Sequence, residues 1–291
     1  MTRVGLTTFV LVFGGCASIR NVCGCSRTLR AVALLLPLAF FACSAARRAP
    51  SDPALIPKFV GDNGKFSKPT SPGPFPAVVV MHGCSGSPGH FEWVKRLNDW
   101  GYATYYIDSF TSRGVKNVCR RKGEEAHPQE VRPMDRVADA YAALAYLRSR
   151  SDVRPERIGL IGFSHGGAAT SQTVRADNAA KAAMSPFAAA VAYYGGCRLE
   201  KFSLSTDLLI LFGEADDWGR VDLCKPMLQR QDAATLARLT VILYPGAYHG
   251  FDIGPRPPRT AFGHHIEYNE LAAKDSLRRT KTFFDQRLKR H

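Results

Sequence analysis

We predict an α/β fold in which helices cover both faces of a mostly parallel central sheet. Short apolar runs alternate with amphipathic stretches along the chain from residue 77 onward. Because parallel strands need crossover connections, usually helices, this alternation indicates a parallel sheet. The 291 residues can bury a full core, and a hydrophobic fraction of 45% is ordinary for a globular protein. We therefore expect one α/β domain over residues 77–291, after a Pro-rich lead-in at residues 47–76.

Hydrophobic periodicity places the individual elements. Buried strands are expected at residues 77–81, 102–108, 157–163, 187–194, 208–212 and 239–244. Helices are expected at residues 91–100, 135–150, 166–175 and 223–237, and in a C-terminal helix with Ala273, Leu277, Thr280, Phe284 and Leu288 on one face. Residues 111–133 are rich in charge and lack periodicity. We expect a long loop there that shapes a binding site.

The first 46 residues have the order of an export signal. Basic residues end at Arg30, an apolar run follows at residues 31–42, and small residues come next. The run is shorter than the roughly 20 apolar residues of a membrane span. We therefore expect an exported protein, periplasmic or extracellular. Cleavage near Ala45 or Ala46, lipidation of Cys43, an uncleaved membrane anchor and a later start of translation are all left open.

The chain is basic, with a formal net charge of +14, of which four arginines within residues 1–45 are a part. The remaining basic residues are scattered, with short clusters at residues 120–122, 278–281 and 287–290. Such short clusters are typical of solvated faces rather than of a nucleic-acid groove. We therefore expect no nucleic-acid partner, although the charge favours anionic surfaces or substrates.

Four cysteines lie beyond the leader, namely Cys84, Cys119, Cys197 and Cys224. An even number in an exported protein indicates disulfide bonds. Three pairings are open, and we favour Cys197 with Cys224. No Cys-x-x-Cys pair or tight histidine cluster accompanies them, so we expect no zinc, no other metal and no cofactor.

A G-x-S-x-G motif carries the main functional signal, in the form Gly162-Phe163-Ser164-His165-Gly166. It lies between an expected strand and an expected helix. A strand that turns at once into a helix holds the middle residue in a strained conformation and needs small neighbours. The Ser164 hydroxyl is thereby presented as a nucleophile at a helix N-terminus. The alternative is a glycine-rich turn with a capping serine.

A serine nucleophile needs a base, and the base needs an acid. In proteins with this motif the acid and base follow the serine in that order. His249 lies in a glycine-flanked loop after the last expected strand, which suits the base. Asp216 follows the preceding strand and is the favoured acid, with Asp217 and Glu214 as alternatives.

His127, His264 and His265 have no expected role in the site. We expect the last two to face solvent in a later loop.

The oxyanion of acyl transfer needs two backbone N–H donors. One should come from His165, the residue after the nucleophile. The other should come from the loop at residues 82–87, where Cys84 is best placed to contribute its amide rather than its thiol.

At this point the sequence resembles the dienelactone hydrolase family of α/β-hydrolases over residues 70–290. The resemblance rests on residues 78–83, residues 101–110 with Arg113, the turn at Ser164, residues 213–216, and His249-Gly250-Phe251. It implies the α/β-hydrolase fold and the triad Ser164, Asp216 and His249.

Two departures from the family pattern bear on the substrate. The founding enzymes use a cysteine nucleophile where this chain has Ser164, and a glutamate where it has Gly83. Arg113 lies near the position of their substrate-binding arginine, so the resemblance implies a substrate-binding role for it.

The resemblance implies a serine hydrolase that cleaves carboxylic esters or lactones of small molecules through an acyl-enzyme on Ser164. Two other functions stay open: a peptidase or amidase on short peptides, which the same triad supports, and a non-catalytic binding protein. The chain has no propeller or other large gating domain, which favours small esters. The oligomeric state is left open.

Overall fold

A computed structural model describes residues 63–125, 127 and 130–289 of the chain. The expected export segment, its cleavage site and Cys43 lie outside the described residues.

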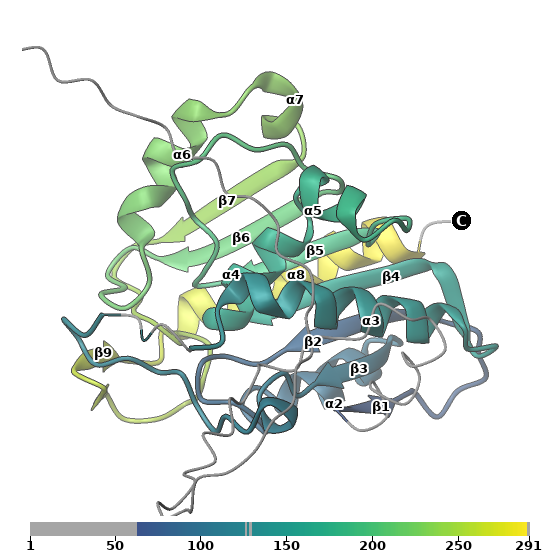
Figure 1. Ribbon diagram of the computed structural model, residues 1–291. Coiled ribbons are helices and arrows are strands. Elements are labelled where there is room, and N and C mark those ends of the chain that lie inside the picture. The colour runs from purple at the N-terminus through teal and green to yellow at the C-terminus, as the bar shows by residue number, and fades with distance from the viewer. Residues whose placement is uncertain (1–62, 126, 128–129, 290–291) are drawn as a thin grey trace, which may run out of the picture. The chain divides into compact units, whose positions relative to one another are not determined.

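The described residues form a central sheet in the order β1-β3-β2-β4-β5-β6-β7 (Figure 1). All pairings are parallel except that of β1 with β3. The expected mostly parallel sheet is thus confirmed. The strands are β1 (Gly64–Ser67), β2 (Phe75–Met81), β3 (Ala103–Ile107), β4 (Val153–Phe163), β5 (Ala189–Tyr193), β6 (Leu208–Gly213) and β7 (Leu239–Tyr244).

Helices cover both faces of this sheet. They are α2 (Glu92–Asp99), α3 (Val137–Arg148), α4 (His165–Thr173), α5 (Ala176–Lys181), α6 (Cys224–Arg230), α7 (Ala233–Leu236) and α8 (Glu270–Phe284). On β4, Gly159 lies against Phe284 of α8, whereas Gly162 lies against Thr170 of α4. Residues three apart on a strand point to opposite faces, so α4 and α8 cover opposite faces. Figure 1 shows α3 and α4 in front of the sheet and α8 behind it.

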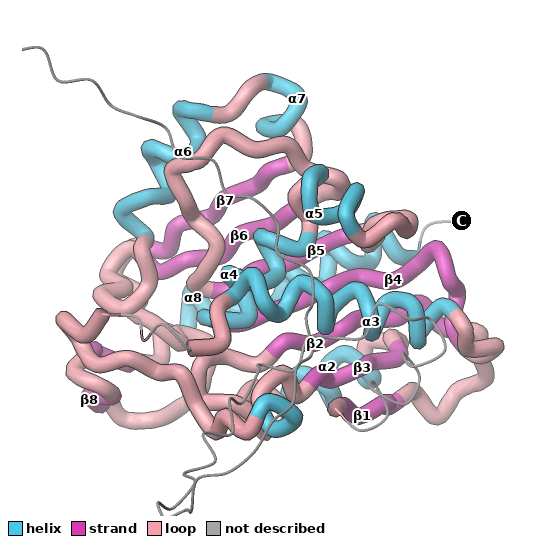
Figure 2. Tube along the Cα trace, in the orientation of Figure 1, coloured by secondary structure: helices cyan, strands magenta, loops and turns pink. Residues whose placement is uncertain are grey.

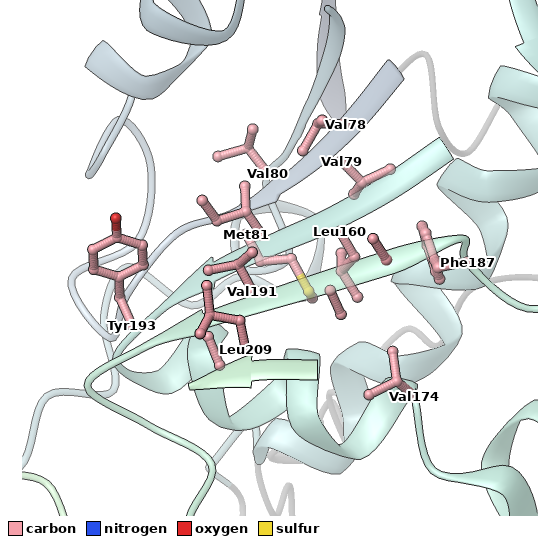
Figure 3. Packing of buried hydrophobic residues seen from close by; sticks show 14 of the residues in the cluster. Val78, Val79, Val80, Met81, Leu160, Val174, Phe187, Val191, Tyr193 and Leu209 are labelled. Atoms are coloured by element: carbon pink, nitrogen blue, oxygen red, sulfur yellow. The ribbon is translucent and has the colours of Figure 1, made fainter. Parts of the chain in front are cut away.

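The core lies on both faces of the inner strands, because crossover helices leave neither face to water. Every residue of β2, β5 and β6 is buried. The strand register sets Val79 beside Leu160 and Val191 beside Leu209, and these side chains pack together in Figure 3.

Besides the unexpected short helix α5 and an earlier start of β4, the structure differs from expectation at three places. The sheet begins before residue 77, because β1 and the first residues of β2 belong to it. The polar edge strand β1 carries no apolar alternation that would reveal it. The expected helix at residues 223–237 is divided at Gln231 and Asp232, where Asp232 accepts a hydrogen bond from the Thr235 amide and starts α7. A short hairpin of β8 (Arg259–Ala261) and β9 (His264–Ile266) was not expected.

Candidate active site

The turn between β4 and α4 has the geometry that its motif predicts. Ser164 has φ 54° and ψ −116°, a conformation that side chains rarely adopt. A Cβ at Gly162 would lie 2.1 Å from the carbonyl oxygen of Gly166, and one at Gly166 would lie 2.3 Å from that of Met81. Only glycine fits at either position. The tight packing therefore holds Ser164 at the N-terminus of α4.

Ser164, His249 and Asp216 are joined by hydrogen bonds. The Oγ of Ser164 lies 2.9 Å from Nε2 of His249, and Nδ1 of His249 lies 2.8 Å from Oδ2 of Asp216. Oδ1 of Asp216 accepts from the amides of Trp218 (2.9 Å) and Gly219 (2.7 Å). The carboxylate is buried and its orientation is set by these amides. The arrangement can orient an imidazole as a base toward a serine hydroxyl.

The two alternative acids lie elsewhere. Asp217 receives hydrogen bonds from Nζ of Lys122 (2.7 Å) and from the amide of His265 (3.2 Å). Glu214 is exposed and lies 3.8 Å from Nζ of Lys225. Asp217 therefore joins two loops, and Asp216 is the residue that contacts His249.

The two expected oxyanion segments meet beside Ser164. His165 is the first residue of α4, so its amide has no acceptor within the helix. Cys84, which follows β2, lines the same cavity as Ser164 and His165. Cys84 and His165, the two expected sources of amide donors, therefore line the same cavity as the nucleophile.

A cavity of about 500 Å³ opens over these residues. Its wall includes residues 118–124 of the long loop, as expected for residues 111–133. Figure 2 shows the long loops gathered at one end of the sheet, where β4, β6 and β7 end. In parallel α/β proteins this carboxyl end of the strands is where ligands bind.

Two disulfide bonds hold the cavity wall. Cys84 pairs with Cys119, and Cys197 pairs with Cys224, which includes the pairing we favoured. The first bond ties the expected oxyanion loop to the long loop. The amide of Val118 also donates to the carbonyl of Cys84 at 2.8 Å. The disulfide and this hydrogen bond therefore join the long loop to the segment that carries Cys84.

Arg113 is not at the cavity, contrary to the substrate-binding role that the resemblance implied. Its side chain is 1% exposed and forms a bidentate ion pair with Asp139, at 2.7 and 2.8 Å. It also donates to the carbonyl of Ser109. Both terminal nitrogens of Arg113 are thus used inside the protein, where they join the segment after β3 to α3, and the residue does not line the cavity.

His264 was expected to face solvent but is 6% exposed. Its ring stacks on Trp218 at a centroid distance of 4.8 Å, and Trp218 lies 5.0 Å from the ring of His249. Sequence reasoning missed Trp218 and Tyr194 as cavity residues. The aromatic residue directly after the two candidate acids was the available signal for Trp218.

A second polar group lies behind His249. The ring of Tyr194 is 4.7 Å from that of His249, and its hydroxyl lies 3.1 Å from Nε2 of His90. Burial lowers the pKa of His90 to about 3, and the nearby His249 adds to the effect. Burial raises the pKa of Asp252 to about 6, although its hydrogen bond with Tyr194 opposes the shift. His90 is therefore neutral at physiological pH.

The sheet, its helices and the strained serine turn define the molecule as an α/β-hydrolase fold. Residues 63–288 match the model of the dienelactone hydrolase family. The chain belongs to this family, as its resemblance implied, and membership identifies it as a hydrolase that acts on ester bonds.

Individual relatives agree with this assignment. A candidate carboxymethylenebutenolidase of Synechocystis sp. is 26% identical over 250 residues, covering 78% of this chain and 92% of that protein. The crystal structure of a candidate dienelactone hydrolase from Klebsiella pneumoniae matches with a TM-score of 0.61 at 23% identity, covering 77% of this chain and 92% of that one. A dienelactone hydrolase-like promiscuous phosphotriesterase from metagenomic libraries matches with a TM-score of 0.59 at 22% identity, covering 78% and 95%. At these identities the crystal structures establish the shared fold.

The two disulfides are consistent with an exported protein, because such bonds persist in oxidising compartments. Across the part of the chain that the structure describes, every helix falls short of the length and apolar character needed to cross a membrane.

Proposed function

We propose that the protein is a serine hydrolase that cleaves carboxylic esters or lactones through an acyl-enzyme on Ser164. The observation that carries the proposal is the hydrogen-bonded series from Ser164 through His249 to the buried Asp216, at the wall of a cavity. Membership of a family of ester hydrolases supports the proposal.

The geometry suggests a role for each group. Oγ of Ser164 attacks the carbonyl carbon while Nε2 of His249 takes its proton. Asp216 accepts a hydrogen bond from Nδ1–H and stabilises the imidazolium that forms. The amides of Cys84 and His165 stabilise the oxyanion of the tetrahedral intermediate. His249 then protonates the leaving alcohol, and a water molecule repeats the sequence to release the acid.

The substrate is proposed as a small ester or lactone, without the dienelactone recognition of the founding enzymes. Gly83 supplies no carboxylate beside Ser164, and Arg113 is held by Asp139. The name of the Synechocystis relative refers to a lactone, which supports retaining lactones in the substrate class.

A fluorophosphonate probe tests the nucleophile. We expect it to label the wild type, and Ser164→Ala to abolish both labelling and ester turnover while the melting temperature changes little. Labelling that is absent from the wild type, or equal in Ser164→Ala, would overturn the proposal.

A substrate comparison separates esterase from peptidase activity. p-Nitrophenyl acyl esters and small lactones should be hydrolysed far faster than peptide anilides by the same preparation. Fast anilide cleavage beside slow ester turnover would instead favour the peptidase function, and binding without turnover of any of the three would favour a non-catalytic role.

We also propose that residues 1–46 direct export to the periplasm or beyond, with attachment through Cys43 as one outcome. The order of basic, apolar and small residues supports this proposal, and so do the two disulfides.

A further inference from the structure

An arginine outside the proposed triad contacts both segments of the proposed oxyanion site. Arg136 ends a 3-10 turn (Pro133–Arg136) directly before α3 and is 0% exposed. Its Nη1 donates to the carbonyl oxygen of His82 at 2.9 Å and to Nδ1 of His165 at 3.0 Å. One nitrogen therefore joins two segments that are far apart in the sequence.

Those two segments carry the two proposed oxyanion donors. His82 lies two residues before Cys84, and the ring that accepts from Arg136 belongs to His165 itself. The segments also touch directly, because a Cβ at Gly166 would lie 2.5 Å from the carbonyl oxygen of His82. A close backbone approach and the shared guanidinium thus join the two segments.

The guanidinium is held in place without a direct ion pair. Among the described residues no carboxylate forms an ion pair with it within 4.0 Å, and both oxygens of the nearby Asp139 bind Arg113. Its Cζ lies 5.2 Å from the ring centroid of Phe110, and this ring also packs edge-on against His82 and His165. Arg113, Asp139 and Arg136 together leave one net positive charge in this buried cluster.

The ionisation of the neighbours preserves this arrangement. Burial lowers the pKa of Arg136 to about 10, so the group remains protonated at neutral pH. Burial and the adjacent Arg136 lower the pKa of His165 to about 3. The ring of His165 is therefore neutral, and its Nδ1 can accept the hydrogen bond from Arg136.

We propose that Arg136 is a positioning residue of the oxyanion site, which sets the spacing of the Cys84 and His165 amides and places a positive charge behind them. This inference rests on the proposed serine hydrolase function. An oxyanion forms only after attack on the carbonyl, so a fault in its site raises the energy of the transition state more than that of the bound substrate. Loss of Arg136 should therefore lower kcat and leave KM nearly unchanged.

The test compares Arg136→Lys and Arg136→Gln with Arg148→Lys. Arg148 is a suitable control because it also donates to three backbone carbonyls, those of Pro155, Ser185 and Pro186, but at the far end of α3. The readouts are kcat and KM for a p-nitrophenyl ester, Ki for an aryl trifluoromethyl ketone, which forms an oxyanion on the serine, and the melting temperature.

We expect both Arg136 variants to lower kcat by about tenfold or more, because small displacements at a reacting centre are costly. KM should change by less than about threefold, and Ki for the ketone should rise by the same factor as kcat/KM falls. Arg148→Lys should lower the melting temperature and leave kcat and Ki close to wild type. If the Arg136 variants have the same kcat and Ki as Arg148→Lys, the positioning role is contradicted. A change in KM alone would contradict it as well.

If the Arg136 variants do not fold, two variants of His165 test the same positioning role. His165→Ala removes the ring that accepts from Arg136 but keeps the backbone amide, whereas His165→Asn offers an oxygen near the position of Nδ1. We expect His165→Ala to lower kcat/KM and weaken the ketone, with Asn restoring part of both. If kcat/KM and Ki for the ketone are the same in His165→Ala, His165→Asn and the wild type, the inference is overturned.

Fluorophosphonate labelling of the wild type is measured in parallel. A wild type that labels and turns over, with Arg136→Lys matching Arg148→Lys, contradicts only the role of Arg136. A wild type that does neither overturns the proposed function and this inference together.

Discussion

At the scale of single residues, the site depends on a choice between two neighbouring aspartates. Asp216 and Asp217 follow the same strand, and either has the chemistry of a triad acid. The turn after β6 buries the side chain of Asp216 and directs it to Nδ1 of His249. The side chain of Asp217 is 30% exposed and binds Lys122. The two neighbouring side chains thus point in different directions along the turn, so that Asp216 is the proposed acid and Asp217 makes a contact between loops.

We therefore predict that Asp216→Asn lowers kcat/KM by about a thousandfold or more, because an amide cannot stabilise the imidazolium or hold its tautomer. Asp217→Asn is the matched control and should lower it by less than about threefold. Steady-state kinetics on a p-nitrophenyl ester checks both variants. A larger loss in Asp217→Asn than in Asp216→Asn would reverse the assignment.

A second residue-scale prediction concerns the glycine before the nucleophile. Gly162→Ala should destabilise the fold by about 1–3 kcal/mol, because its methyl group would overlap the carbonyl of Gly166. The fluorophosphonate labelling rate should fall with it, since relief of the overlap moves Ser164. Urea unfolding and labelling kinetics measure the two effects. A variant as stable and as reactive as the wild type would show that the turn is not tightly packed.

At the scale of elements, the long loop before α3 gives the site its wall. Residues 118–124 line the cavity, and the disulfide from Cys119 to Cys84 joins them to the loop after β2. The basic residues at 120–122 also lie at this wall, although the sequence by itself indicated a solvated face. Lys122 and Asp217 connect the wall to the turn that carries Asp216.

This connection predicts different effects for the two disulfides. Replacing Cys84 and Cys119 together by serine should cost about 3–4 kcal/mol of stability and lower kcat, since residue 84 supplies a proposed oxyanion amide. Replacing Cys197 and Cys224 together should cost a similar amount but affect kcat less. Urea unfolding and steady-state kinetics on the two double variants provide the comparison. Equal losses of kcat would argue against coupling between the long loop and the oxyanion amide.

At the scale of the whole molecule, histidines whose pKa is lowered by burial make the free energy of unfolding depend on pH. Burial, followed by the effect of Arg136 or His249, lowers the pKa of His82, His90 and His165 below 6.5. Between pH 6.5 and about 3 the unfolded chain binds protons at His90 and His165 that the folded protein does not, and His82 acts in the same direction. The stability from these groups is therefore present above pH 6.5 and is lost as pH falls. Asp252, with its raised pKa of about 6, contributes in the opposite direction.

We predict that the free energy of unfolding decreases as pH is lowered from 7 to 4.5. Each enclosed histidine contributes a slope of up to about 1.4 kcal/mol per pH unit. Urea unfolding at several pH values measures the slope, and His90→Gln should reduce it by up to that amount. The same slope in His90→Gln and the wild type would contradict the assignment.

The proposed export also gives a prediction at the scale of the whole molecule. Expression of the full chain in a bacterium should yield a periplasmic or extracellular protein whose first residue, by mass spectrometry, lies between Cys43 and Arg47. A chain that lacks residues 1–46 should stay in the reducing cytoplasm and unfold more readily, because its disulfides do not form there. Full-length protein that starts at Met1 and remains in the cytoplasm would contradict export.

Much of the fold could be predicted because its signals are local. The strand at residues 239–244 was predicted with the bounds that the structure has, and the helix after Ser164 was predicted to within two residues at each end. The edge strand β1 escaped prediction because its pairing with β3 is made by backbone groups, which leave no side-chain pattern. The role implied for Arg113 depended on an approximate alignment, and its pairing with Asp139 depends on how α3 packs.

The sequence by itself determined the alternating sheet and helices, the family, and the three residue types of the proposed triad in their order. The sheet and helices follow from hydrophobic periodicity. The serine turn follows from glycines, which its tight backbone conformation requires. Only the tertiary structure showed which of Asp216 and Asp217 contacts His249, paired Cys84 with Cys119 and Cys197 with Cys224, and placed Arg113 away from the cavity. It also placed Arg136 in contact with His82 and His165, in the two segments of the proposed oxyanion site. Such outcomes depend on distances between segments that are far apart in the chain, and no local pattern records those distances.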